Sequence, residues 1–203
     1  MRQGHLRIGS YEPYDVSRVL ARFVERYPGI QITARFANSP ELAAMLTNYE
    51  VDVAVLAGSE RREEFLAAPF RQPRLIVVAP RTRPWTSRRG IRPAELTNQT
   101  LIVREAGSAA RQAFEKLLLE AGISRARLFE FSSREGVLSA VAAGLGLSAV
   151  FDEGLLPDER IVRLPIRGCS IRLDVQVMHL RERRSNAPIR AFLEFARTFA
   201  SMT

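Results

Sequence analysis

Serine, asparagine and glycine residues follow short apolar runs at several places in the sequence, each just before an amphipathic segment. Such residues begin helices, where hydroxyl, amide and backbone N–H groups lie open to a ligand and the helix dipole favours an anion. Ligands of open α/β sheets bind at the carboxyl ends of strands, so these positions predict a binding site for a small anionic molecule. The predicted junctions are Ser10-Tyr11, Asn38-Ser39, Glu105-Ala106-Gly107-Ser108 and Ser132-Ser133.

Charged and aromatic side chains beside these junctions complete the predicted site. Arg104 and Glu105 flank the third junction, but adjacent residues of a strand face opposite ways, so we expect at most one to point into the site. Tyr11 and Phe151 are candidate walls, with packing against the core as the alternative. For the serines and Asn38, the alternative is that they only cap helices, which stabilises each helix by ~1 kcal/mol. A residue can cap a helix and bind a ligand at the same time.

The sequence has no pattern typical of catalysis or metal binding. His5 and His179 lie far apart, without a cysteine, histidine or carboxylate at metal-ligand spacing. Cys169 has no partner that would make it a nucleophile or half of a redox pair. Asp52 and Asp174 interrupt strands and are interpreted as edge or solvent-facing residues. We therefore expect binding without catalysis, and neither a metal nor a cofactor.

Length and composition fit a two-lobed α/β protein. The 203 residues are 46% hydrophobic and 26% charged, which allows one large domain or two lobes of about 100 residues. The sequence contains no apolar run long enough to cross a membrane, no secretory signal and a single cysteine. These features predict a cytoplasmic protein with no membrane contact.

The net charge of +8 comes almost entirely from arginine, since Lys116 is the only lysine. A basic balance suggests nucleic acid, but no aromatic series or recognised DNA-binding module accompanies the arginines. Their densest run lies in a segment rich in proline and glycine, and it is interpreted as a solvated loop. The run comprises Arg81, Arg83, Arg88, Arg89 and Arg92.

Short apolar strands alternate with amphipathic helices along the chain, which predicts mostly parallel central sheets with helices on both faces. We expect two Rossmann-like lobes: lobe I from residues 1–80 and 166–203, and lobe II from 81–165, joined by two crossover strands near 80–93 and 161–165. The expected strands cover 6–9, 30–36, 51–56, 75–79, 101–103, 128–131, 147–151 and 171–177. The expected helices carry apolar stripes over 16–27, 42–49, 110–121, 137–145 and 189–199.

Three blocks of residues resemble the effector-binding domain of LysR-type transcription regulators. They are Leu6–Ser10 followed by Phe23–Ile30; Glu41-Leu42 followed by Val51–Val55; and Glu135–Val137 followed by Val141–Leu147, a helix ending in a double-glycine turn. Their order and spacing match the family over essentially the whole chain. One departure is Phe151-Asp152, where the family often has a proline after the strand.

The resemblance implies a type-2 periplasmic-binding-protein-like fold that binds a small effector between the lobes. It further implies that DNA is bound by an N-terminal winged helix-turn-helix absent from these residues, and that the protein is a homodimer, with a tetramer possible at full length. The candidate contact surfaces are the first helix, with Arg18, Arg22 and Arg26, and the strand near Val175. The segments 38–42 and 48–52 faintly resemble the corresponding segments of LysR-type regulators associated with phosphonate use. Amino acids, organic acids and sulfur compounds remain alternative effectors.

Two other functions use the same fold. A solute-binding protein of a transporter would carry a secretion signal or a lipid-anchoring cysteine. An enzyme such as a dehydratase would need an acid/base pair in the cleft.

Overall fold

In the computed structural model, which describes residues 4–58, 62–123 and 127–201, the chain divides into two compact units. Unit 1 comprises Met1–Gln72 and Leu173–Thr203, and unit 2 comprises Pro73–Arg172. Within the described residues, none of the helices combines the length and the apolar character needed to cross a bilayer.

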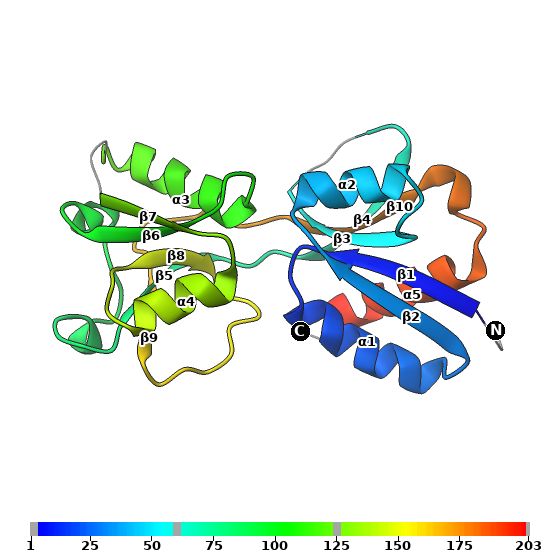
Figure 1. Ribbon diagram of the computed structural model, residues 1–203, viewed down its shortest axis with the longest axis horizontal. Coiled ribbons are helices and arrows are strands. Elements are labelled where there is room, and N and C mark those ends of the chain that lie inside the picture. The colour runs from blue at the N-terminus through cyan, green and yellow to red at the C-terminus, as the bar shows by residue number, and fades with distance from the viewer. Residues whose placement is uncertain (1–3, 59–61, 124–126, 202–203) are drawn as a thin grey trace. The chain divides into compact units, whose positions relative to one another are not determined.

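Unit 1 is built on a five-stranded sheet in the order β2-β1-β3-β10-β4. Strands β1, β2 and β3 are parallel, whereas β10 is antiparallel to both β3 and β4. Figure 1 shows α2 on one face of this sheet and α1 and α5 on the other. The bounds are β1 (Gly4–Ser10), α1 (Tyr14–Arg26), β2 (Ile30–Phe36), α2 (Ser39–Thr47), β3 (Val53–Ala57), β4 (Phe65–Arg71), β10 (Val175–Leu180), the 3₁₀ turn η3 (Arg181–Arg183) and α5 (Ala187–Ser201).

The core of unit 1 follows from the apolar stripes of its helices. Leu42 and Leu46 of α2 are fully buried and pack against the sheet residues Leu56 and Met178. On the other face, Phe23 of α1 meets an aromatic ring of α5 edge to face, with 5.5 Å between the ring centroids of Phe23 and Phe192. These contacts hold α2 against one face of the sheet and join α1 to α5 on the other.

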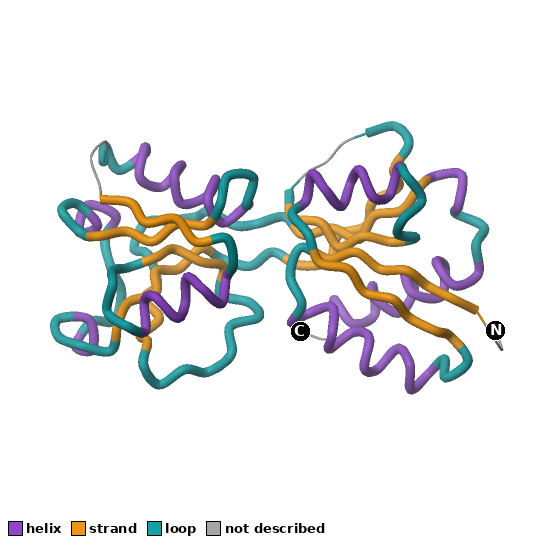
Figure 2. Tube along the Cα trace, viewed as in Figure 1, coloured by secondary structure: helices purple, strands orange, loops and turns teal. Residues whose placement is uncertain are grey.

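Unit 2 holds an antiparallel sheet, β8-β5-β9, beside the parallel pair β6-β7. A parallel bridge between Leu101 and Leu147 joins the two, and the Ser148 hydroxyl donates to the Ile102 carbonyl at 2.7 Å. Figure 2 shows these strands between helices α3 and α4. The bounds are β5 (Leu75–Pro80), η1 (Trp85–Ser87), η2 (Pro93–Leu96), β6 (Thr100–Arg104), α3 (Ala109–Glu120), β7 (Arg127–Phe131), α4 (Arg134–Ala142), β8 (Ser148–Phe151) and β9 (Ile161–Pro165).

In the double-glycine turn after α4, each position requires glycine for a different structural reason. Gly144 follows the C-cap Ala143 with φ +83°, a left-handed conformation that side chains disfavour. Gly146 passes so close to β6 that an added Cβ would lie 2.3 Å from the Thr100 carbonyl oxygen. The turn therefore seats β8 directly beside β6.

The structure differs from the sequence-based topology in three respects. Strand β5 belongs to unit 2, because it pairs with β8 and β9 there, so the unit boundaries lie at 72/73 and 172/173 instead of 80/81 and 165/166. The expected crossovers near 80–93 and 161–165 therefore run inside unit 2. Strand β4 was not expected, and the sheets are more mixed than the predicted parallel ones because β5 and β10 run against their neighbours.

Candidate functional site

In unit 1, the first two predicted junctions meet at the carboxyl ends of β1, β2 and β3. The Ala37 amide donates to the Ser10 carbonyl at 3.3 Å, and the Tyr11 amide donates to the Val55 carbonyl at 3.1 Å. The Ser39 hydroxyl accepts a hydrogen bond from the Ala57 amide at 3.0 Å, which ties the start of α2 to the end of β3. Ser10, Tyr11, Asn38 and Ser39 thus share one edge of the sheet.

The Ser10 side chain is buried and committed to its own turn. Its hydroxyl donates to the Glu12 carbonyl at 2.7 Å and accepts from the Glu12 amide at 3.4 Å. Helix α1 starts after Pro13, and the Glu12 carboxylate accepts the Tyr14 amide at 2.9 Å. Sequence reasoning missed Glu12, which serves the start of this helix in place of Ser10. Tyr11 packs against the core cluster around Leu42, the packing alternative stated above.

Asn38 caps α2 as expected. Its Oδ1 accepts from the Glu41 amide at 3.0 Å, while the Glu41 carboxylate accepts from the Asn38 amide at 3.3 Å, a reciprocal capping box. The pattern Asn38-x-x-Glu41 was visible in the sequence. Among the hydrogen bonds of the described residues, none involves the Asn38 Nδ2, so this amide can donate to a ligand.

In unit 2, the other two junctions also lie at one edge. β6 and β7 are in register from Thr100–Arg127 to Arg104–Phe131, and the Leu101–Leu147 bridge aligns β8 in the same direction. The carboxyl ends of β6, β7 and β8 therefore point to the same side, as do the N-terminal ends of α3 and α4.

The start of α3 has an N-cap residue whose side chain makes no cap hydrogen bond. Gly107 has φ +91°, which turns the chain into the helix, and Ser108 is the N-cap. The Ser108 side chain is buried yet makes no capping hydrogen bond. Its hydroxyl and the first N–H groups of α3 can therefore bind an anion together.

Arg104 and Glu105 pair with each other instead of facing opposite ways. The Arg104 Nε and Nη2 each donate to the Glu105 carboxylate at 2.7 Å, because Glu105 lies beyond the end of β6 and its side chain turns back. Burial acts to raise the pKa of Glu105, but the hydrogen bonds from Arg104 hold it below its ordinary value. Arg111 supports the pair by donating to the Arg104 carbonyl at 2.9 Å. The pair is neutral overall, so attraction for an anion comes from the N-terminus of α3.

The fourth junction and Phe151 contribute less. The Ser133 hydroxyl accepts from the Gly136 amide at 3.0 Å and caps α4, and both Ser132 and Ser133 are exposed. Phe151 is 8% exposed, so its ring belongs mainly to the core. At the departure from the family, Asp152 accepts from the Arg74 amide at 2.8 Å and from its Nε at 3.2 Å.

Asp52 was expected at an edge or in solvent, and this prediction is wrong. The residue is 5% exposed and accepts from the Arg7 amide, Nε and Nη2 at 2.8, 3.2 and 2.8 Å, and from the guanidinium of Arg183. Burial acts to raise the pKa of Asp52, but the hydrogen bonds and charges of Arg7 and Arg183 bring it below its ordinary value. Asp174 is exposed, as expected, and accepts from Gln72 at 2.8 Å. Neither residue lies at a junction.

In each unit, the helix starts lie at one edge of the sheet. The two chain segments that connect the units begin and end at this same edge. In unit 1, Val175 stands opposite both Ala57 and Arg71 at the ends of β3 and β4. In unit 2, Leu75 stands opposite Phe151 at the end of β8, next to a bridge between Arg74 and Arg172. Among the described residues, no group of three or more His, Cys, Asp or Glu side chains is placed to hold a metal ion.

Two α/β units joined by two chain crossings, with helix starts at the crossing edges, define a ligand-binding domain of the two-lobed class. The profile of the LysR substrate binding domain family matches residues 1–201. The chain belongs to this family and has its type-2 periplasmic-binding-protein-like fold.

Curated relatives are named as regulators. The chain is 32% identical over 198 residues to a "RuBisCO operon transcriptional regulator" of Allochromatium vinosum, covering 95% of this chain and 66% of the relative. It is 31% identical over 193 residues to the "HTH-type transcriptional regulator CbbR" of Rhodospirillum rubrum, covering 93% and 63%. The chain thus spans slightly less than two thirds of these relatives. Their names favour neither a transporter component nor an enzyme.

Solved structures agree in fold. The CcmR regulatory domain of Synechocystis, solved in complex with 2-PG, has a TM-score of 0.87 at 24% identity, covering 98% of both chains. The effector-binding domain of QuiR in complex with shikimate has a TM-score of 0.86 at 16% identity, covering 98% of both chains. The BenM effector-binding domain with its effector benzoate has a TM-score of 0.85 at 14% identity, covering all of this chain and 94% of that one.

Proposed function

We propose that this chain senses a small anionic effector for a LysR-type transcription regulator. The effector binds at the helix starts described above, and its binding is transmitted to a DNA-binding part of the whole, cytoplasmic protein. The observation that carries the proposal is the placement of the helix starts: in each unit they lie at the edge from which the crossings run. A ligand at such an edge meets backbone N–H and hydroxyl donors.

The α3 start is the anchor for the acidic group of the effector. The Ser108 hydroxyl makes no cap hydrogen bond, Gly107 has no side chain to cover the backbone, and the charges of Arg104 and Glu105 cancel locally. In unit 1, Asn38 and Ser39 offer donors of the same kind at the start of α2. An acidic effector agrees with shikimate and benzoate, the carboxylates named with two of the similar structures.

A thermal-shift screen of small acids tests this function. The panel comprises benzoate and shikimate, which are carboxylates, a simple alkylphosphonate, and 2-phosphoglycolate, which carries both a carboxylate and a phosphate group. A ligand present at about 100 times its Kd adds ~2.7 kcal/mol to stability. We expect Ser108→Ala to remove most of this gain. Ser139→Ala, on an exposed face of α4, is the matched control and keeps it. Equal gains in both variants would contradict an anchor at α3.

The regulator acts as a homodimer in this proposal, and as a tetramer if dimers pair. Support comes from exposed apolar side chains near unpaired sheet edges: Phe36 on β2 is 51% exposed, and Leu119 on α3 and Leu128 on β7 are 80% and 46% exposed. The strand near Val175, by contrast, was a poor candidate surface, because Val175 is buried and β10 pairs on both sides.

Light scattering after size exclusion tests the dimer. Leu119→Glu places a charge on the proposed contact and shifts the chain toward the monomer. Leu156→Glu is the control, since Leu156 is 63% exposed in a loop of the same unit. A dimer that tolerates Leu119→Glu as well as Leu156→Glu would rule out this face of α3.

A further inference from the structure

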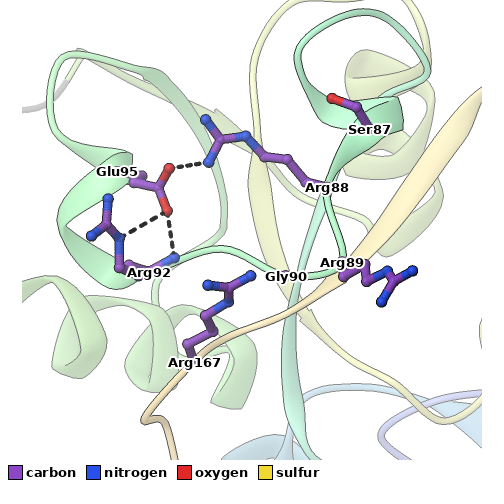
Figure 3. A pocket seen from close by; sticks show the side chains of 7 residues that line it. All are labelled: Ser87, Arg88, Arg89, Gly90, Arg92, Glu95 and Arg167. Carbon is purple, nitrogen blue, oxygen red and sulfur yellow. Dashed lines mark hydrogen bonds and ion pairs between the residues drawn. The ribbon is translucent and has the colours of Figure 1, made fainter.

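A basic pocket lies wholly within unit 2, and none of its residues belongs to the junctions of the candidate site. Its volume is about 540 Å³, within the range of about 300–1,000 Å³ that small-molecule sites occupy. Figure 3 shows how its side chains come from the segment that runs from η1 into η2 and from the chain after β9. The lining residues are Ser87, Arg88, Arg89, Gly90, Arg92, Glu95 and Arg167.

Positive charge exceeds negative charge in this pocket. Glu95 accepts from the Arg92 amide and Nε at 2.9 and 3.4 Å, and from the guanidinium of Arg88. These bonds lower the pKa of Glu95 to about 2, so it is ionised at neutral pH. One carboxylate faces four arginines, an excess of three positive charges. In the described part of the chain, no carboxylate pairs with Arg89 or Arg167.

The pocket is held in shape by backbone contacts. An added Cβ on Gly90 would lie 2.8 Å from the Pro165 carbonyl oxygen, so only glycine lets the two segments approach this closely. The Ile91 amide donates to the Pro165 carbonyl at 3.0 Å, and the Arg167 amide donates to the Ile91 carbonyl at 2.8 Å. Arg88 stacks over Trp85, 5.5 Å from the ring centroid. The backbone that carries these arginines is therefore held in place, while Arg89, Arg92 and Arg167 are exposed, in agreement with the solvated loop that the sequence suggested.

We propose that this pocket is a second ligand site, which binds a small polyanion carrying phosphate or carboxylate groups. Guanidinium forks match both kinds of group in bidentate geometry. Arg167 is the proposed recognition residue, because none of the hydrogen bonds and ion pairs of the described residues involves its side chain. In Figure 3 this side chain extends from the opposite segment toward the Arg92–Glu95 cluster. Glu95 holds Arg88 and Arg92 in place and limits the charge that a ligand must supply.

Calorimetric titration of the 203-residue chain with pyrophosphate tests the site, and citrate in a parallel titration distinguishes phosphate from carboxylate ligands. We expect Arg167→Gln to weaken binding of the preferred probe about tenfold and Arg167→Lys to weaken it less, because lysine keeps the charge but loses the fork. Arg190→Gln removes the same charge from an exposed position on α5 and is expected to leave the affinity unchanged.

The outcomes separate this site from the proposed effector site. Ser108→Ala leaves pyrophosphate or citrate binding intact if the pocket is the binding site, whatever becomes of the effector. The proposal is overturned if neither probe binds, if Arg167→Gln behaves like Arg190→Gln, or if Ser108→Ala abolishes binding that Arg167→Gln preserves. It is equally overturned if Arg167→Gln weakens the binding of duplex DNA but of neither small anion.

Discussion

Each unit holds one carboxylate between two arginines, but in different surroundings. In unit 1, the Asp52 side chain is 6% exposed, and its partners Arg7 and Arg183 are 34% and 25% exposed. In unit 2, the Glu95 side chain is 21% exposed, and its partners Arg88 and Arg92 are 35% and 70% exposed. The first cluster is closed and the second open to solvent.

The two clusters also join different parts of the chain. Asp52 precedes β3 and links β1 to η3, so Arg7 and Arg183 reach it from far along the sequence. Glu95 pairs with arginines three and seven residues before it. The difference teaches that a carboxylate–arginine cluster holds the fold together when it closes long-range contacts out of solvent. A cluster of residues close in sequence that is exposed to solvent and has more arginines than carboxylates is available for a ligand.

The largest expected effect comes from removing the charge of each carboxylate. Asp52→Asn leaves two guanidinium groups without their anion, and we expect it to lower the free energy of unfolding by about 2–3 kcal/mol, less than a fully buried pair because both arginines are partly exposed. Glu95→Gln is expected to change the free energy of unfolding by less than about 1 kcal/mol, since exposed ion pairs contribute little to stability. Urea denaturation of both variants measures the difference. Equal losses would remove the distinction between the clusters.

The pH dependence of stability provides a second test of the Asp52 cluster. Burial alone would raise the pKa of Asp52, but its arginine partners hold the pKa of the folded state below the ordinary 3.8. The stabilisation by Asp52 is therefore present above that value and is lost as the pH falls through the lower, folded pKa. We expect the stability gap between wild type and Asp52→Asn to stay constant from pH 7 to about 5 and to narrow below pH 4. A gap that widens in acid would mean that burial outweighs Arg7 and Arg183.

Local patterns predicted the helices well, and long-range pairing explains what they missed. Helix α2 follows from Asn38, Pro40 and its apolar stripe, all within a few residues. Strand β4 has no alternating pattern and contains Pro69; it is a strand because β10, about a hundred residues later, pairs along it. Likewise, only the partners β8 and β9 assign β5 to unit 2.

The predicted junctions were found at the expected strand ends, but sequence could not assign the bonds within them. Ser10 and Ser108 are the same residue type after similar strands, yet one hydroxyl is bound within its turn and the other makes no cap bond. Whether the serine hydroxyl forms such a bond depends on whether the following backbone turns back toward the side chain. Arg104 and Glu105 illustrate the same limit, because where β6 ends decides that they pair.

The smallest expected effect separates the helix starts of the two units. Asn38→Ala removes the cap bond to the Glu41 amide and is expected to cost ~1 kcal/mol of unfolding free energy. Ser108→Ala removes a side chain without a cap bond, so we expect a change within about 0.5 kcal/mol. Urea denaturation without ligand measures both, with Ser139→Ala as the control. A cost at Ser108 equal to that at Asn38 would show that the hydroxyl already serves its helix. The Ser108 hydroxyl would then be bound to its own helix, as the Asn38 Oδ1 is, and an effector would have to displace an existing bond to reach it.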